Sequence, residues 1–146
     1  MNANRRVFAG RYRQGKPFVR AKVVVVNPIN GRQITIEKNF WIDTGFEGGF
    51  HIAEVHLSEI RIIGVDPAVG SVGLAGGERR RGYFCFAFLQ QIEDYELPPP
   101  GIEATLILQG SSDHGLLGLE VLKNFTVKFD GPNEMLTILS GSNDNS

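Results

Sequence analysis

The chain has 146 residues, of which 42% are hydrophobic and 21% charged, and its formal net charge at pH 7 is −1. A chain of this length forms one domain with a core of its own, and its composition excludes disorder over most of the sequence. The near-neutral charge argues against a general nucleic-acid binder, and the single cysteine, Cys85, excludes an intrachain disulfide and a Cys-rich zinc site.

The first part of the chain is polar and basic. Residues 1–22 contain seven Lys and Arg residues and no acid, and we interpret residues 1–16 as a basic N-terminal arm. The start lacks the apolar region of a signal peptide, and no apolar run approaches the roughly 20 residues that span a bilayer. We therefore expect a cytoplasmic protein without a membrane partner. The basic stretch over residues 5–22 keeps nucleic acid open as an alternative partner, with binding that weakens as salt rises.

Residues 17–140 are expected to form a β domain. Apolar and alternating runs predict strands at 18–27, 32–38, 40–43, 83–91, 102–109, 125–130 and 135–139. Residues 54–59 and 117–124 are expected to be short helices, residues 65–82 a glycine-rich excursion and residues 141–146 a disordered tail. Together these elements predict a small, mostly antiparallel β domain with one or two short helices, closed as a barrel or a folded-over sheet.

The most informative segment is Phe-Trp-Ile-Asp-Thr-Gly-Phe at residues 40–46. Asp43 follows three apolar residues, and a carboxylate that leaves a core is costly unless it is hydrogen-bonded or shares a proton. Thr44 offers a hydroxyl to a neighbouring backbone or a partner chain, and Gly45 permits a close approach that a Cβ would block. Taken alone, the tripeptide is a weak signal, and an ordinary Asp-Thr-Gly turn is the favoured interpretation.

Two further segments agree with a functional interpretation of Asp43. The glycine-rich run 69–77 is suited to a mobile loop that covers a ligand. Later in the chain, Leu116, Leu117 and Gly118 lie at the start of the predicted helix 117–124. Two apolar residues and a glycine at this point let a strand pass close to the turn that bears the aspartate.

In this order the three segments resemble the motifs of the retropepsin-like aspartic proteases, the single-domain relatives of retroviral protease. Phe46 directly follows the glycine, so residues 43–46 resemble the D-T-G-F signature of a prokaryotic subgroup of this family. The resemblance covers roughly residues 18–139. It implies an all-β fold, a small closed antiparallel β-barrel, and an aspartic endopeptidase, a hydrolase that needs no metal and no cofactor. Two aspartates would share one proton and activate a water molecule.

The resemblance also implies a homodimer and a set of site residues. A search for a second Asp-[Ser/Thr]-Gly in the chain finds none, so each subunit would supply one catalytic aspartate at a two-fold axis. The catalytic turn would be Asp43, Thr44 and Gly45. A peptide or protein substrate would be held by Phe46 and by a flap whose tip is Leu74, Ala75, Gly76 and Gly77.

Other interpretations compete with this one. A catalytically silent domain of the same fold, which serves as a dimerisation or peptide-binding module, is the main alternative. His51 and His56 are five residues apart and do not match the i,i+4 spacing of a helical zinc pair. The Ser-Ser-Asp-His sequence at 111–114 lacks the surroundings of a serine hydrolase nucleophile, and we interpret it as a polar turn.

Overall fold

Strands make up most of this chain, as the sequence predicted. The structure, a computed structural model, describes residues 7–140 and contains 55% strand and 10% helix. Its strands are β1 (Val7–Arg13), β2 (Lys16–Val26), β3 (Gln33–Ile42), β4 (Phe50–Ile52), β5 (Ala68–Gly73), β6 (Arg79–Ile92), β7 (Tyr95–Glu96), β8 (Ile102–Leu108), β9 (Gly115–Leu117), β10 (Phe125–Asp130) and β11 (Met135–Ser140). The helices are α1 (Leu57–Ile62) and α2 (Leu119–Leu122), with a 3₁₀ turn η1 (Glu54–His56) before α1. Within this part of the chain no helix is long and apolar enough to cross a membrane.

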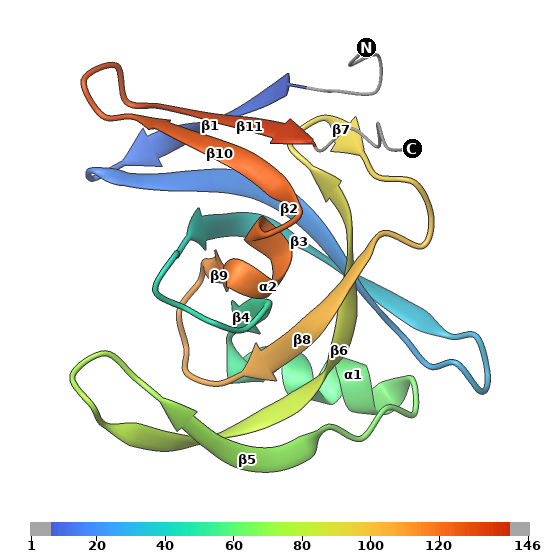
Figure 1. Ribbon diagram of the computed structural model, residues 1–146. Helices are drawn as coiled ribbons and strands as arrows, with labels where there is room; N and C mark the ends of the chain where they lie inside the picture. The colour runs from blue at the N-terminus through green and yellow to red at the C-terminus, as the bar shows by residue number, and fades with distance from the viewer. Residues whose placement is uncertain (1–6, 141–146) are drawn as a thin grey trace.

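The centre of the fold is a ring of six strands. β2, β3, β9, β4, β8 and β6 are hydrogen-bonded in that order, and β6 pairs back with β2 (Figure 1). Most pairings are antiparallel, but β3 with β9 and β4 with β8 are parallel, so the sheet is mixed. Fully buried side chains such as Phe40, Phe50 and Leu106 fill the core.

The two strands predicted at 32–38 and 40–43 form one continuous strand, β3. Ile36, Phe40 and Ile42 are buried, which places alternate positions of the strand on the core face. Asn39, the residue between the two predicted strands, lies inside β3 and pairs with Arg20 of β2. β2 and β3 form the predicted hairpin, with Val19 opposite Phe40 and Val25 opposite Ile34.

The N-terminal region is more ordered than a polar arm. Residues 7–13 of the predicted arm form β1, which lies between β11 and β2 in the sheet. Arg11 pairs with both Met135 and Phe18, so the strand is bonded along both edges. Residues 1–6 of the predicted arm and the predicted disordered tail 141–146 lie outside the described residues.

Two predicted elements have different lengths in the structure. The predicted helix 117–124 is only α2, because residues 115–117 pair with β3 and β4 as strand β9. The predicted helix 54–59 is extended by α1 to Ile62, with Leu57 and Ile60 buried in the core. The glycine-rich excursion 65–82 contains β5 and the first residues of β6, which pair as an antiparallel hairpin.

Candidate active site at the Asp43 turn

Asp43 lies directly after β3 and is fixed by backbone hydrogen bonds. Its N–H donates to the carbonyl of Leu117 in β9 at 2.9 Å, so Asp43 continues the β3–β9 ladder. Its carboxylate oxygen Oδ1 accepts the N–H of Gly45 at 3.0 Å, and its carbonyl accepts the N–H of Phe46 at 3.2 Å. The side chain is half-buried, while Thr44 and Gly45 are exposed. The carboxylate is therefore held in a tight turn that faces solvent on one side.

The chain around Gly118 makes further contacts with this turn. The N–H of Gly118 donates to the Gly49 carbonyl at 2.9 Å, and the N–H of Leu119 donates to the Phe46 carbonyl at 2.8 Å. A Cβ added to Gly118 would lie 2.5 Å from the Phe46 carbonyl oxygen and closer still to that of Gly48. Only glycine permits this approach. The expectation that the Leu-Leu-Gly strand passes close to the aspartate turn is thus confirmed.

Phe46 packs beneath the turn. A Cβ on Gly48 would meet the Phe46 ring at 2.7 Å, and the ring centroid lies 6.0 Å from that of His51. The Phe46 side chain is half-buried. These contacts give it a packing role in this subunit, and the substrate contact that the sequence resemblance implied for it stays a prediction.

The Thr44 side chain has no hydrogen-bonding partner within residues 7–140, whereas the Asp43 side chain accepts the Gly45 N–H. The residue is exposed, next to a half-buried carboxylate. Gly45 is also open, since an added Cβ would meet only Asp43 Oδ1, at 3.4 Å. The exposed face of the turn therefore keeps a free hydroxyl and free space for a group from outside the subunit.

The predicted flap residues form the turn of the β5–β6 hairpin. Leu74 donates its N–H to the Glu78 carbonyl at 2.7 Å, and Gly77 donates its N–H to the Leu74 carbonyl at 3.1 Å. Gly76 and Gly77 have φ angles of +91° and +84°, a region that side chains other than glycine rarely adopt. Leu74 is half-buried, and Ala75, Gly76 and Gly77 are exposed. Figure 1 shows that this hairpin turn and the Asp43 turn project toward the same side of the molecule.

A groove lined by basic and aromatic side chains lies beside β3 and was not predicted from the sequence. The Trp41 ring stacks on the His114 ring with centroids 3.8 Å apart and planes 14° apart. Lys16 Nζ lies 4.6 Å from the Trp41 centroid. The groove has a volume of about 450 Å³ and is lined by Arg13, Gln14, Phe18, Arg20, Lys38, Asn39, Trp41, Asp113 and His114. The basic composition of residues 1–22 was the one sequence signal that pointed to it.

Electrostatic effects in this groove are visible at His114. Burial lowers the pKa of His114, the positive charges of Lys16 and Lys38 lower it further, and Asp113 acts in the opposite direction. Burial also lowers the pKa of Lys38, against the opposing charges of Asp113 and Glu59. The imidazole therefore stays neutral to lower pH than an ordinary histidine.

The two histidines considered as a zinc pair have separate partners. His51 Nε2 lies 3.1 Å from the Gln109 carbonyl oxygen. His56 lies between Lys38 Nζ and Glu59 Oε1, at 3.0 Å from each. Among the residues that the structure describes, no group of three His, Cys, Asp or Glu side chains could hold a metal ion. Ser112 contacts His114 at 3.1 Å within the polar turn that the sequence predicted.

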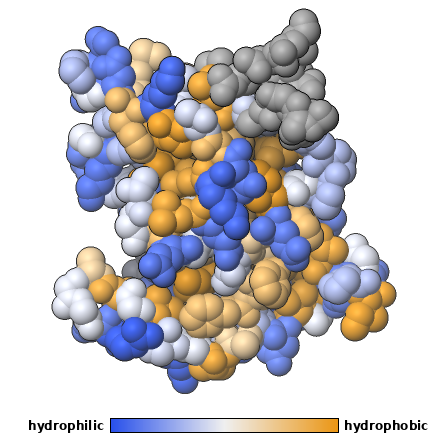
Figure 2. Space-filling view, viewed as in Figure 1, coloured by the Kyte–Doolittle hydropathy of each residue, from blue (hydrophilic) through white to orange (hydrophobic). Residues whose placement is uncertain are grey.

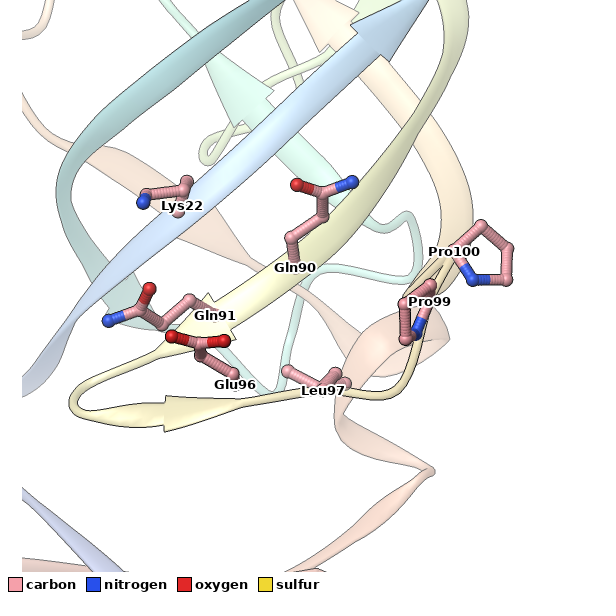
Figure 3. A pocket seen from close by; sticks show the side chains of 7 residues that line it. All are labelled: Lys22, Gln90, Gln91, Glu96, Leu97, Pro99 and Pro100. Carbon is pink, nitrogen blue, oxygen red and sulfur yellow. The ribbon is translucent and has the colours of Figure 1, made fainter.

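Two other cavities contain none of the predicted site residues. One cavity, of about 680 Å³, is bordered by residues of β6 such as Cys85 and Phe86. Burial of the Cys85 thiol raises its pKa to about 11. Phe86 is 64% exposed there, and Figure 2 shows hydrophobic residues reaching the surface among hydrophilic ones. The other, of about 240 Å³, is lined by Lys22, by residues of β6 and β7 and by the proline loop (Figure 3). Its amide and carboxylate side chains do not form a recognisable catalytic set.

Comparisons with protein-family models, curated proteins and solved structures found no match for this chain. The candidate active site is the Asp43 turn, with β9 on one side and the β5–β6 hairpin projecting in the same direction.

Proposed function

We propose that this protein is a retropepsin-like aspartic endopeptidase that acts as a homodimer. The observation that carries the proposal is the Asp43-Thr44-Gly45 turn at the end of β3, fastened by the Leu116-Leu117-Gly118 strand inserted between β3 and β4. In this proposal the six-strand ring is the closed β-barrel of that fold, and the parallel β3–β9 and β4–β8 pairs are the departure from a purely antiparallel barrel.

The proposed chemistry needs two copies of Asp43. Two adjacent carboxyl groups share one proton, because two like charges close together are costly. The ionised carboxylate takes a proton from water, and the water oxygen attacks the carbonyl carbon of the peptide bond. The neutral carboxyl donates its proton to the carbonyl oxygen. When the tetrahedral intermediate breaks down, the C–N bond cleaves and the leaving nitrogen takes up a proton, so two peptide fragments are released.

The surroundings of Asp43 support this assignment. Among residues 7–140 nothing bonds to the Thr44 hydroxyl, and Gly45 has open space, as a turn that meets its own copy at a two-fold axis would need. The β5–β6 hairpin, with Leu74–Gly77 at its tip, would cover an extended peptide and hold it as an added strand through backbone hydrogen bonds.

The test compares wild type with Asp43→Asn on a peptide library at mildly acid pH. We expect cleavage by wild type and none by the variant, with both proteins folded by circular dichroism. Asp66→Asn is the matched control, because Asp66 is an exposed carboxylate whose ion pair with Arg61 is 3.9 Å long. Equal cleavage by wild type and Asp43→Asn would refute the proposal. Peptide binding by a wild-type dimer that never cleaves would identify the silent binding module instead.

A mixing experiment tests the shared site. Wild type and Asp43→Asn are mixed in equal amounts, allowed to exchange subunits, and compared with the same total amount of wild type. If each site needs two copies of Asp43, about one quarter of the activity remains, since random pairing leaves that share of dimers with both aspartates. About one half would remain if each subunit worked alone, and that result would exclude the two-fold site.

A further inference from the structure

The groove beside β3, called here the basic groove, lies next to the proposed catalytic turn. Trp41, which forms part of its wall, lies in β3 two residues before Asp43, which directly follows that strand. Successive side chains of a strand point to opposite faces, so Trp41 and Asp43 project to the same face, about 7 Å apart along the chain. Asp43 keeps this geometry because it continues the ladder to Leu117. A peptide bound at Asp43 therefore has the basic groove within reach of its neighbouring side chains.

Positive charge exceeds negative charge in this groove. Arg13, Arg20 and Lys38 line it together with one acid, Asp113, and Lys16 stands over the Trp41 ring.

The cations of the groove are only weakly neutralised by the protein. Arg20 reaches Glu37 at 3.6 Å, but both side chains are about half exposed, and exposed pairs contribute little. Arg13 lies 5.6 Å from the Phe18 ring centroid and has no carboxylate partner within residues 7–140. Within the described residues Arg13 therefore offers an anion donors that no carboxylate holds, and Arg20 offers donors held only by the exposed contact with Glu37.

The aromatic wall of the groove suits a side chain with an apolar stem. Phe18 lies opposite Trp41 in the β2–β3 pairing, and His114 stacks on Trp41. Methylene groups can pack on the Phe18 ring and against the edge of the Trp41–His114 stack while a terminal carboxylate reaches the guanidinium groups, which bind carboxylates well. A nucleic acid fits less well, since its chain of phosphates would also meet Asp113 and the Asp43 turn.

On the basis of the proposed function, we propose that the basic groove binds a Glu or Asp side chain of the substrate, so that the enzyme cleaves peptide bonds close to an acidic residue. Arg13 and Arg20 would bind the carboxylate, and Trp41 and Phe18 would contact the stem. In this proposal, residues of β1 and β2 select the substrate, and the reaction takes place at the end of β3.

Binding can be tested without cleavage in the Asp43→Asn protein. Trp41 is the single tryptophan of the chain, so its fluorescence reports directly on the groove. The probes are matched decapeptide mixtures that carry a fixed Glu or a fixed Gln among uncharged residues, at pH 6. We expect the Glu peptides to bind about tenfold more tightly than the Gln peptides and to change the Trp41 signal. Equal affinity for the two mixtures would overturn the proposal, and so would tighter binding of an oligouridylate that displaces the Glu peptides.

The charge dependence is tested with a double variant and a matched control. In an Asp43→Asn background, Arg13→Gln with Arg20→Gln should bring the Glu-to-Gln affinity ratio close to one. Lys123→Gln with Lys128→Gln removes the same charge from exposed positions near and in β10 and should keep the ratio. An unchanged ratio in the Arg13/Arg20 variant would overturn the assignment of these residues.

Cleavage separates this inference from the proposed function. Wild-type protein that cleaves Glu and Gln peptides with equal kcat/KM refutes the groove preference and leaves the aspartic protease proposal intact. Wild-type protein that cleaves neither mixture counts against the protease, while the binding ratio in Asp43→Asn still decides what the groove prefers. A higher kcat/KM for Glu peptides that is lost in the Arg13/Arg20 variant supports both proposals.

Discussion

The contact between Gly118 and the Asp43 turn makes a sharp prediction for Gly118→Ala. Gly118 has φ −107° and ψ −173°, an extended conformation that alanine adopts without strain. The cost of the substitution is therefore purely steric. The new Cβ would lie 2.5 Å from the Phe46 carbonyl oxygen and also against the Gly48 carbonyl oxygen. Backbone atoms cannot rotate away as a flexible side chain does, so the turn itself must move.

The size of the effect follows from the cost of overpacking. Inserting a methyl group into a well-packed site costs about 1–3 kcal/mol. For a domain of this size each kcal/mol lowers Tm by about 2–4 °C, so we expect a decrease of roughly 2–12 °C. Cleavage should fall by more than the loss of folded protein explains, because the shifted atoms belong to the turn that holds the Asp43 carboxylate.

Urea unfolding followed by Trp41 fluorescence and by circular dichroism measures this cost. Gly131→Ala is the matched control: Gly131 lies in the turn between β10 and β11, its φ is not positive, and an added Cβ would meet nothing within 4 Å. The control should stay within about 0.5 kcal/mol of wild type. If Gly118→Ala unfolds at the same urea concentration as Gly131→Ala, the tight contact between β9 and the aspartate turn does not exist as described.

Three further predictions concern single side chains. Because burial raises the pKa of Cys85 to about 11, roughly one part in ten thousand of this thiol should be thiolate at pH 7. Cys85 should therefore react with a disulfide reagent far more slowly than a free cysteine, and equal reaction rates would contradict its burial. In Lys16→Met the pKa of His114 should rise toward its ordinary value, because a repelling cation is removed, and NMR of the ring measures this. In wild type the lowered pKa of His114 makes the free energy of unfolding increase with pH in the range just below 6.5, where the unfolded chain binds more protons than the folded one. Glu120→Ala should cost about 1.5–3 kcal/mol in urea unfolding, since the Glu120 carboxylate accepts the backbone N–H of Thr105 and ties α2 to β8. The same loss in Glu103→Ala, an exposed residue of β8, would show that the Thr105 contact is not the cause.

The aspartate turn could be predicted from the sequence because its determinants are local. Three apolar residues before Asp43 predict a buried strand that ends there, and Leu116, Leu117 and Gly118 predict a strand that approaches closely. The parallel pairing of β9 with β3 could not be predicted in this way. β9 is only three residues long, and its partner lies more than seventy residues earlier in the chain, so no local pattern specifies the pairing.

Polar residues lie inside paired strands at two places where the prediction and the structure differ. Asn39 was expected to separate two strands, but β3 continues through it, and the neighbouring Lys38 reaches His56 at 3.0 Å. Residues 7–13 were expected to belong to a basic arm, but the backbone of this segment is bonded to β11 and β2 on both edges. In both cases the backbone hydrogen bonds complete the sheet although the local sequence is polar.

The position of β1 changes what the basic N-terminal region means for function. Arg13, Lys16 and Arg20 are separated in sequence from Trp41, yet the β1–β2–β3 meander places Arg13 opposite Lys16 and Phe18 opposite Trp41. The basic residues and the strand that leads to Asp43 are therefore parts of one surface. Deleting residues 1–16 would remove the strand that joins β2 to β11, so lost binding in such a protein would reflect lost structure. Only charge-removing substitutions in the intact sheet, such as Arg13→Gln with Arg20→Gln, can separate the recognition of an acidic substrate from the folding of the domain.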